Sequence, residues 1–278
     1  MKVSIIGTGT MGCGIAQVFA QSNFVEIVYL TDIDIEIAKN GKSKIEKNLK
    51  KLVAKNKMTI EASDAILNRI VVTSRDELSD VDLVVEAAIE DISIKKQIFK
   101  ELDAICKEQT IFATNTSSLS ITEIGNGINR SIIGMHFFNP APVMNLVEVT
   151  SGLNTPTEII DKIFDISYRL GKVPVKVNEA PGFVVNRILI PMINEAVFVF
   201  SEGTASADDI DTAMKFGANH PMGPLALGDL IGLDVVLAIM EVIHQETGDD
   251  KYRPAPLLRK MVRAGKLGRK TGEGFFKY

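Results

Sequence analysis

A glycine-rich turn near the amino terminus places the strongest constraint on how this chain folds. Residues 3–6 are a short apolar run typical of a buried strand, and residues 13–21 have the pattern of a helix. Between them stands a G-x-G-x-x-G, which reads Gly7-Thr8-Gly9-Thr10-Met11-Gly12. In this spacing the first glycine permits a tight turn, the second permits close approach of a ligand, and the third lets the helix pack on the strand. The chain therefore begins with a β-α unit whose turn is suited to phosphate.

A carboxylate completes this pattern. Asp32 ends a second apolar run, residues 26–30, at the spacing of about 20 residues expected after such a glycine loop. A carboxylate there accepts hydrogen bonds from ribose hydroxyls and repels a 2′-phosphate, while the N–H groups that begin the helix attract a pyrophosphate. We therefore expect an NAD site. Its residues are Gly7, Gly9, Thr10, Met11, Gly12 and Asp32.

Apolar runs rich in β-branched residues alternate with amphipathic segments up to about residue 180. Because these runs are short and continuous, they indicate strands buried on both faces of a sheet. Strands are predicted at residues 3–6, 26–30, 70–72, 82–85, 110–113, 132–135 and 145–149. The fold class is therefore α/β, with a Rossmann-type, doubly wound, mostly parallel sheet.

The pattern changes at a Pro-Gly break, residues 179–183, beyond which no strand is expected. Helices are predicted at residues 184–201, 207–216, 228–245 and 255–264. We expect an NAD-binding domain of residues 1–182 and a smaller all-helical domain of residues 183–278. Because so short a segment forms a small core, an apolar face shared with a second copy is expected, as in a homodimer joined through this domain.

Charge and composition exclude several classes of function. The net charge of −4 argues against nucleic acid or an acidic membrane surface as partner, and no apolar stretch is long enough to span a bilayer. The two cysteines, Cys13 and Cys106, suit a reducing compartment, and with three histidines in the chain they predict no metal site. A cytoplasmic location is expected.

A basic segment stands out in this acidic chain. Residues 39–57 contain eight lysines and one acid, Glu46, and their apolar residues have helical spacing. This segment is either a solvated helix face or a clamp for a polyanionic group such as coenzyme A, whose phosphates need nearby ammonium groups. Both interpretations remain open at this point.

Removing hydride from an alcohol carbon requires a group that accepts the hydroxyl proton, and histidine suits neutral pH. His136 ends a predicted strand and enters a Pro-rich turn, the usual place for site residues in such sheets. Glu148 lies on the next predicted strand and could hold the imidazole. Since a histidine near an apolar run is more often structural, spacing alone leaves this pair open. His220 and His244 are interpreted as structural.

At these residues the chain resembles the 3-hydroxyacyl-CoA dehydrogenase family, in its compact single-function bacterial form, over essentially its whole length. The shared motifs are the Gly7–Gly12 loop and residues 86–90, 115–119, 136–140, 179–187, 221–224 and 270–275. The resemblance implies reversible, NAD-dependent oxidation of a short-chain 3-hydroxyacyl-CoA, such as 3-hydroxybutyryl-CoA, to the 3-ketoacyl-CoA. It also implies a dimer.

The resemblance further implies roles for individual residues. His136 is expected as general base and acid, held by Glu148, and Ser117 and Asn186 as the groups that bind the substrate oxygen. Other positions follow the family's cofactor and CoA contacts: Glu90, Lys95, Asn139 and Lys270 for NAD, with Ser117, and Lys51 and Lys55 for CoA. Two departures weaken the CoA assignment: Asn48 stands where some relatives carry serine, and the segment from Ser117 to His136 is slightly shorter than in mitochondrial relatives.

Two alternatives compete with this interpretation. A dehydrogenase of free 3-hydroxyacids would share the glycine loop but would use a catalytic lysine, and the basic segment would then lack a purpose. A non-catalytic NAD-binding protein on the same fold would show a degraded site. The presence of Ser117, His136, Glu148 and Asn186 argues against both alternatives.

Overall fold

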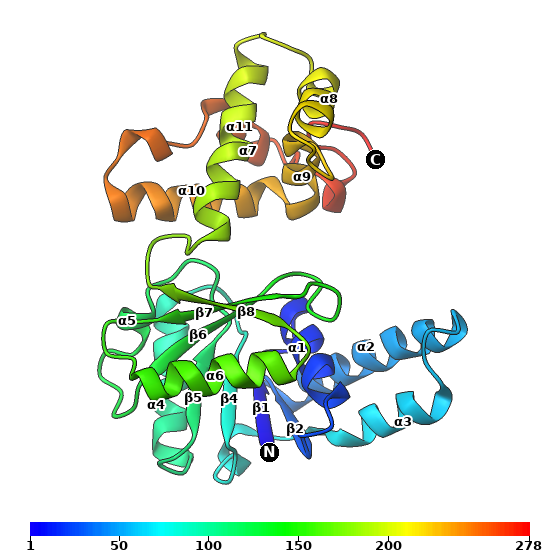
Figure 1. The fold of residues 1–278 in the computed structure, drawn as a ribbon, viewed down its shortest axis with the longest axis vertical. Coiled ribbons are helices and arrows are strands. Elements are labelled where there is room, and N and C mark those ends of the chain that lie inside the picture. The colour runs from blue at the N-terminus through cyan, green and yellow to red at the C-terminus, as the bar shows by residue number, and fades with distance from the viewer. The chain divides into compact units, whose positions relative to one another are not determined.

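All 278 residues are described by a computed structural model, which divides into two units, Met1–Glu179 and Ala180–Tyr278. The first unit is built around a sheet and the second is helical (Figure 1). The domain boundary expected between residues 182 and 183 stays a prediction.

Eight strands form a single sheet in the first unit, in the order β3-β2-β1-β4-β5-β6-β7-β8. Neighbouring strands are parallel except for β6 and β7, which are antiparallel. The expected α/β, Rossmann-type, mostly parallel sheet is therefore confirmed. The strands are β1 Lys2–Ile6, β2 Ile27–Thr31, β3 Ile70–Val72, β4 Leu83–Glu86, β5 Ile111–Thr114, β6 Ile132–Phe137, β7 Leu146–Ser151 and β8 Val173–Asn178.

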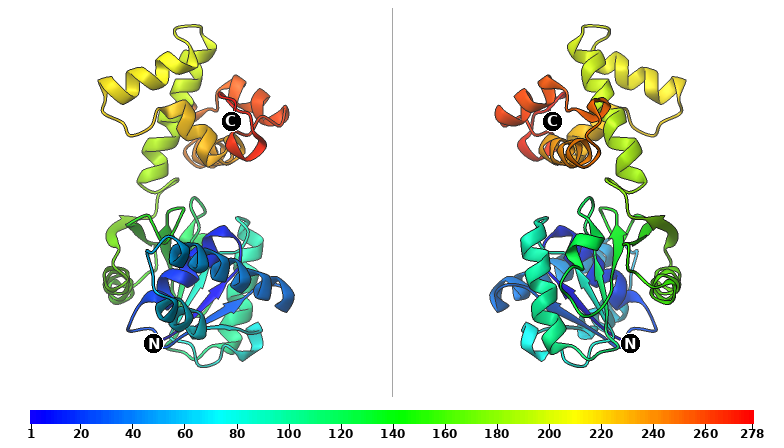
Figure 2. Two further views of the ribbon diagram at one scale, coloured as in Figure 1. Left: turned by 90° about the vertical axis from the view of Figure 1, so that its right-hand side faces the viewer. Right: turned by 90° about the vertical axis from the view of Figure 1, so that its left-hand side faces the viewer.

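Helices cover both faces of this sheet (Figures 1 and 2). They are α1 Thr10–Gln21, α2 Ile35–Ala54, α3 Ile60–Arg69, α4 Ile92–Ile105, α5 Ile121–Ile124 and α6 Thr157–Arg169. The sheet order reverses between β1 and β4, which follow one another in the sheet but not in sequence. In open α/β sheets, ligands bind outside the carboxyl ends of the strands at such a reversal. The glycine loop that follows β1 lies at this edge.

Strand β8 is absent from the sequence-based prediction. Its segment, Val-Pro-Val-Lys-Val-Asn, contains a proline and lies at the edge of the sheet, where Val173 is 59% exposed and Val175 is 36% exposed. Proline is tolerated in an edge strand but counts against a strand in a sequence pattern. Valine at every second position, Val173, Val175 and Val177, is the alternating pattern of a half-buried strand, so a signal was available in this segment.

The basic segment forms most of α2, which runs beside α3 (Figure 1). Asp34 caps α2 by accepting a hydrogen bond from the Glu36 N–H, and Ile45 and Leu49 bury its apolar side. The helix ends at Ala54, and Asn56 has a φ of 55°. The apolar residues whose spacing predicts this helix, from Ile37 to Val53, all lie within α2, so the expected helix is confirmed, and Lys55 lies in the connection to α3.

The second unit contains five α-helices: α7 Val185–Ser201, α8 Ala207–Gly217, α9 Pro224–Ile231, α10 Leu233–Thr247 and α11 Pro256–Arg263. The prediction of one helix over residues 228–245 is wrong, because Gly232 separates α9 from α10 with a φ of 104°. Such a φ belongs to glycine and ends a right-handed helix. None of the helices in the chain combines the length and the apolar character that crossing a bilayer requires.

Two buried carboxylates organise the second unit. Asp211 on α8 accepts hydrogen bonds from the N–H groups of Leu225 and Ala226, in the first turn of α9. Asp229 on α9 accepts from the N–H groups of Phe275 and Phe276, so it holds the carboxyl-terminal segment. Because buried polar groups are costly without partners, these contacts favour one arrangement of the helices.

Candidate active site

At each glycine of the loop after β1, the geometry shows what the absence of a side chain provides. Gly7 has a φ of 97°, and a Cβ atom there would lie 2.6 Å from the Ala87 carbonyl oxygen. A Cβ atom on Gly12 would lie 1.9 Å from the Gly7 oxygen, so α1 packs against the turn itself. At Gly9, by contrast, a Cβ atom would meet nothing within 4 Å. Gly9 therefore leaves open space beside the backbone.

The same loop begins α1. Gly9 is the N-cap residue of α1, and no side chain caps the helix at this end. Thr10 and Met11 form the first turn, whose N–H groups together with the helix dipole favour an anion. Open space at Gly9 and an uncapped helix start are the two features that a bound pyrophosphate requires.

Asp32 is held at the end of β2. One carboxylate oxygen accepts hydrogen bonds from the N–H and the hydroxyl of Thr8, at 2.6 and 2.7 Å, and the other accepts from the Ile33 N–H at 2.8 Å. Since a carboxylate has about four acceptor positions, Asp32 can still accept ribose hydroxyls. Thr8 was not among the expected site residues, although it lies inside the glycine motif.

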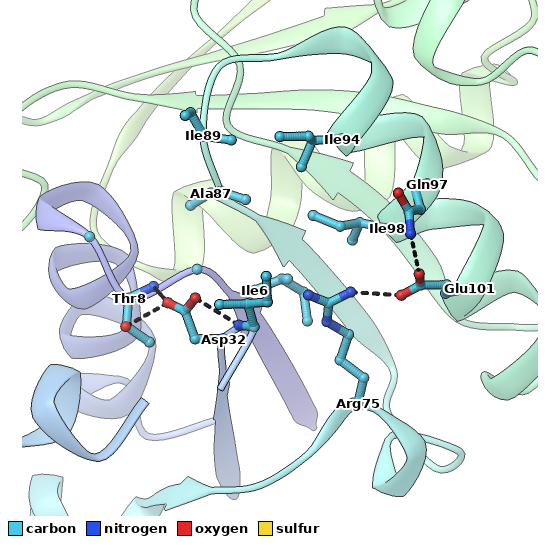
Figure 3. Close-up of a pocket in the computed structure, with 14 residues that line it drawn as sticks. Ile6, Thr8, Asp32, Arg75, Ala87, Ile89, Ile94, Gln97, Ile98 and Glu101 are labelled. Atoms are coloured by element: carbon cyan, nitrogen blue, oxygen red, sulfur yellow. Dashed lines mark hydrogen bonds and ion pairs between the residues drawn. The ribbon is translucent and has the colours of Figure 1, made fainter. Parts of the chain in front are cut away.

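A cavity of about 670 Å³ opens beside Asp32 (Figure 3). Gly7, Gly9 and Asp32 line it, and its isoleucines include Ile33 and Ile89, which are 81% and 67% exposed. Apolar side chains left in contact with water around a polar loop are typical of a ligand site. The glycine loop, the carboxylate and this cavity together fit a dinucleotide.

Sequence reasoning missed the polar part of this cavity. Arg75 donates a hydrogen bond to Glu101 at 2.6 Å, and Gln97 donates to the other Glu101 oxygen at 3.0 Å. Arg75 follows β3, whose carboxyl end shares an edge with β1 and β2, so its position after a strand was an available signal. Gln97 and Glu101 lie on α4 and carry no local signal.

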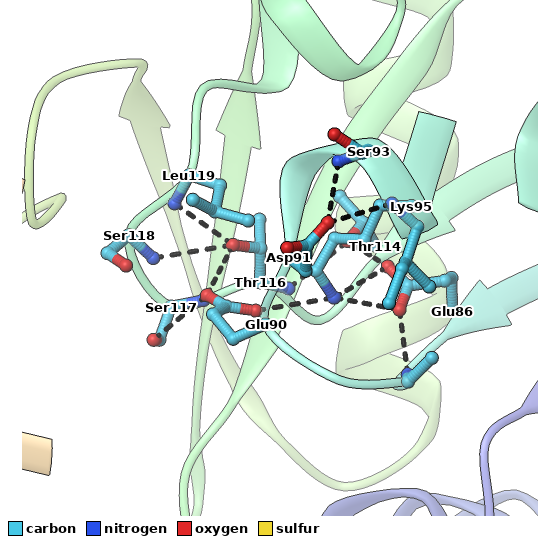
Figure 4. Close-up of polar contacts among 12 residues, drawn as sticks. Glu86, Glu90, Asp91, Ser93, Lys95, Thr114, Thr116, Ser117, Ser118 and Leu119 are labelled. Carbon is cyan, nitrogen blue, oxygen red and sulfur yellow. Dashed lines mark hydrogen bonds and ion pairs between the residues drawn. The ribbon is translucent and has the colours of Figure 1, made fainter. Parts of the chain in front are cut away.

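An ion-pair network centred on the buried Lys95 and Glu86 supports the next part of the site (Figure 4). The Lys95 ammonium, 1% exposed, lies 2.7 Å from a Glu86 oxygen and 3.3 Å from a Glu90 oxygen. The other Glu90 oxygen accepts hydrogen bonds from the Thr116 hydroxyl at 2.6 Å and from the Ser117 N–H at 2.8 Å. Lys95 thus acts inside the protein, where it fixes Glu90, and Glu90 in turn fixes the loop that carries Ser117.

The protonation of Glu90 follows from these contacts. Burial alone would raise the pKa of the Glu90 carboxyl. The positive charge of Lys95 and the hydrogen bonds from Thr116 and Ser117 outweigh burial and hold this pKa below its ordinary value. Glu90 is therefore an anion at neutral pH.

His136 and Glu148 face each other across the antiparallel pair of β6 and β7, as directly opposed residues. The His136 Nδ1 atom lies 2.8 Å from a Glu148 carboxylate oxygen. The Glu148 side chain is fully buried, and the His136 side chain is 7% exposed. Because β6 is parallel to β5, His136 lies at the same edge of the sheet as the glycine loop. The expected contact between the two side chains is present.

Comparison with known protein families agrees with this geometry. The model described as 3-hydroxyacyl-CoA dehydrogenase, NAD binding domain, matches residues 2–180, and the C-terminal domain model of that family matches residues 182–278. The chain belongs to the 3-hydroxyacyl-CoA dehydrogenase family. It is therefore an oxidoreductase with an NAD-binding domain.

Individual relatives of this family member are similar over nearly their full lengths. A 3-hydroxybutyryl-CoA dehydrogenase of Clostridioides difficile is 54% identical, with 100% of this chain and 99% of the relative covered. The human mitochondrial hydroxyacyl-coenzyme A dehydrogenase is 45% identical, with 99% and 90% covered. The crystal structure of (S)-3-hydroxybutyryl-CoA dehydrogenase from Ralstonia eutropha aligns with a TM-score of 0.95 and 48% sequence identity. The alignment covers 100% of this chain and 98% of that one.

The remaining expected residues of this dehydrogenase lie in three other places. Asn139 is exposed in the loop between β6 and β7. Asn186 lies in the first turn of α7, in the second unit. Lys270, also in the second unit, is paired with Asp234 on α10 at 2.5 Å.

The lysines of α2 do not all project freely. Lys39 and Lys50 pair with Glu36 and Glu46, and Lys42 donates a hydrogen bond to the Ile70 carbonyl. Lys51 and Lys55, expected to meet CoA, are exposed. The positive charge available to a ligand is thus concentrated in the exposed remainder, which is Lys44, Lys47 and Lys51 on α2 and Lys55 and Lys57 in the connection that follows it.

Proposed function

We propose that this enzyme reversibly oxidises short-chain (S)-3-hydroxyacyl-CoA, such as 3-hydroxybutyryl-CoA, to the 3-ketoacyl-CoA with NAD. The observation that carries the proposal is the buried His136–Glu148 pair at 2.8 Å, at the same sheet edge as the dinucleotide site. Family membership supports the acyl-CoA substrate, and the Ralstonia eutropha relative supports the (S) configuration.

His136 is the proton acceptor in this proposal. The Glu148 carboxylate occupies Nδ1 and orients the ring, so Nε2 is the atom that exchanges a proton with the substrate hydroxyl. When bound, NAD⁺ supplies the hydride acceptor, and NADH supplies the donor in the reverse direction. As His136 takes the proton it becomes an imidazolium, which the buried anion of Glu148 stabilises. In reduction the imidazolium returns that proton.

Ser117 and Asn186 are proposed to bind the oxygen on the reacting carbon. Donors fixed around that oxygen matter because negative charge develops on it in the transition state. Glu90 positions Ser117 by accepting a hydrogen bond from its N–H at 2.8 Å. The Ser117 hydroxyl has a single hydrogen and lies 3.2 Å from the same Glu90 oxygen, so in this proposal it turns from Glu90 to donate to the substrate oxygen. Glu90, Lys95, Asn139 and Lys270 are proposed as the family's further cofactor positions, with Lys95 acting through Glu90.

Coenzyme A is proposed to bind along α2. Its phosphates carry several negative charges, and the exposed lysines at the end of α2 and just after it, Lys51 and Lys55 among them, offer ammonium groups without strict geometry. A homodimer through the second unit and a cytoplasmic location complete the proposal. The support for the dimer is the exposed apolar surface of that unit, with Ile188 68% and Phe216 82% exposed.

The decisive experiment is the oxidation of NADH in the presence of acetoacetyl-CoA, measured beside free acetoacetate. We expect turnover of the CoA ester alone, with a fall of at least about 100-fold in His136→Ala, as is typical for the loss of a general base. His244→Ala is the matched control, because His244 lies on α10 and has only a long contact to Asp250, at 3.5 Å.

Three results would contradict the proposal in whole or in part. Turnover of free acetoacetate would support a dehydrogenase of free 3-hydroxyacids. A folded, NADH-binding protein without turnover of either compound would support a non-catalytic role. An active His136→Ala variant would leave the substrate class standing but would remove His136 from the mechanism.

A further inference from the structure

A buried lysine outside the catalytic set holds the loop that follows His136. Lys172 lies between α6 and β8 and is 7% exposed. Its ammonium donates hydrogen bonds to the carbonyl oxygens of Ala141 at 2.6 Å and Met144 at 2.8 Å. Both partners are carbonyls rather than carboxylates, and burial lowers the pKa of Lys172 below the ordinary lysine value. A buried cation is costly, so these contacts need an explanation beyond packing.

The two carbonyls belong to one turn. Residues 138–145 connect β6, which carries His136, to β7, which carries Glu148. Within this loop the N–H groups of Val143 and Met144 both donate to the Pro140 carbonyl. Lys172 therefore joins two points of a turn that is already closed on itself, and it fixes that turn to the α6–β8 connection.

The opposite side of the same loop contacts the cofactor helix. A Cβ atom on Gly14 of α1 would lie 3.2 Å from the Ala141 Cβ and 3.3 Å from the Pro142 Cδ. Ala141 is 2% exposed, so it is enclosed between α1 and the Lys172 ammonium. The glycine loop begins α1, and Asn139 stands two residues before Ala141. The close packing of Gly14 against Ala141 and Pro142, which leaves little room for a Cβ atom, thus relates the phosphate end of the cofactor site to the loop beside His136.

We propose that Lys172 is a positioning residue for the bound dinucleotide, which it serves by holding residues 138–145 against α1. This inference rests on the proposed function for the part played by His136. Lys172 itself touches neither substrate nor cofactor. Its loss lets the loop move away from α1, so the nicotinamide half of the cofactor, next to His136, is bound less well than the ADP-ribose half on the glycine loop and Asp32.

The test is calorimetric titration of Lys172→Met with NADH and with ADP-ribose, which lacks the nicotinamide. We expect NADH binding to weaken about tenfold, or about 1.4 kcal/mol, and ADP-ribose binding to change less than about threefold. Lys172→Arg, which keeps the charge and the donors, restores part of the NADH affinity. The matched control is Lys176→Met, because Lys176 lies on β8 but is exposed and paired with Asp161 at the surface.

Steady-state kinetics give a second readout. Lys172→Met is expected to raise the KM for NADH while the KM for acetoacetyl-CoA stays within about twofold, because the proposed CoA contacts lie on α2. Should Lys172→Met not fold, Gly14→Ala tests the same contact from α1, where the added methyl group displaces Ala141 and Pro142. Gly14→Ala is expected, like Lys172→Met, to weaken NADH binding more than ADP-ribose binding.

Equal losses of NADH and ADP-ribose affinity, or unchanged NADH affinity in a folded variant, would show that Lys172 is only structural and would overturn the inference. The binding measurements also separate this inference from the proposed function. If acetoacetyl-CoA is not a substrate of the wild-type protein but Lys172→Met still loses NADH selectively, the proposed function fails and the role of Lys172 stands.

Discussion

At the scale of single residues, Asp32 shows how one side chain shapes both structure and specificity. It accepts three hydrogen bonds from Thr8 and Ile33, and it lines the cavity in which a ribose would lie. Asp32→Ser removes the negative charge that repels a 2′-phosphate. We expect NADH binding to weaken by roughly 10- to 100-fold, as for loss of a charged hydrogen-bond partner, and the ratio of kcat/KM for NADPH to that for NADH to rise.

The measurement is initial rates with both reduced dinucleotides in the wild type, in Asp32→Ser and in Asp161→Ser, an exposed control on α6. An unchanged cofactor ratio in a folded Asp32→Ser variant would mean that other residues exclude the 2′-phosphate. Arg75, which lines the same cavity and is neutralised by Glu101, would then be the next residue to change.

The lowered pKa of Glu90 predicts how the stability of the fold depends on pH. Because its pKa is lower in the folded protein than its ordinary value of 4.5, its charge stabilises the fold above that value. This contribution is lost as the pH falls through the lowered pKa. Glu90→Gln lacks the charge, so wild type and variant should differ in free energy of unfolding at neutral pH and converge in acid as the pH falls through the lowered pKa of Glu90. Urea unfolding at several pH values measures this. A difference that is constant with pH would show that Glu90 acts only as a hydrogen-bond acceptor.

At the scale of elements, the start of α9 depends on a residue from another helix. Gly223, its N-cap residue, has no side chain that could cap the helix. Asp211 of α8 takes this role by accepting hydrogen bonds from the N–H groups of Leu225 and Ala226. Asp211→Ala leaves a buried donor, the Leu225 N–H, and a partly buried one, the Ala226 N–H, without a protein partner, and an unsatisfied buried group costs about 1–3 kcal/mol. We expect a lower urea midpoint for unfolding of the second unit, as measured by circular dichroism. Glu202→Ala, at an exposed position after α7, should show no comparable shift of the midpoint. A stable Asp211→Ala variant would contradict this role.

Elements with a strong local pattern were predictable from the sequence, and contacts between distant elements were not. The buried central strands and the glycine turn have local signatures. The His136–Glu148 contact, which spacing alone left open, joins two consecutive strands connected by a turn. Strand β8 was missed because its proline counts against a strand in a sequence pattern, and the α9–α10 break because the positive φ of Gly232 depends on its surroundings. The contact of Lys172 with the loop at Ala141 joins residues 31 positions apart and leaves no trace in either segment.

At the scale of the whole molecule, charge is distributed unevenly. The chain carries a net charge of −4, so its overall field repels an anionic substrate such as an acyl-CoA. The exposed lysines at the end of α2 offset this locally, and because they are in water their effect decays over a Debye length, about 10 Å at 0.1 M salt. If CoA binds there, the KM for acetoacetyl-CoA should rise with ionic strength. The KM for acetoacetyl-dephospho-CoA, which lacks the 3′-phosphate, should rise less steeply with ionic strength.

The double variant Lys51→Glu/Lys55→Glu tests this arrangement directly. It should raise the KM for acetoacetyl-CoA about tenfold or more, leave the KM for NADH nearly unchanged, and flatten the salt dependence, because the charges that salt screens are gone. Lys162→Glu/Lys176→Glu changes the net charge by the same amount at exposed positions on α6 and β8. If both double variants raise the KM equally, the substrate responds to the net charge of the protein and α2 is a solvated helix face. A selective effect of the α2 variant would instead assign the polyanionic end of the substrate to this helix.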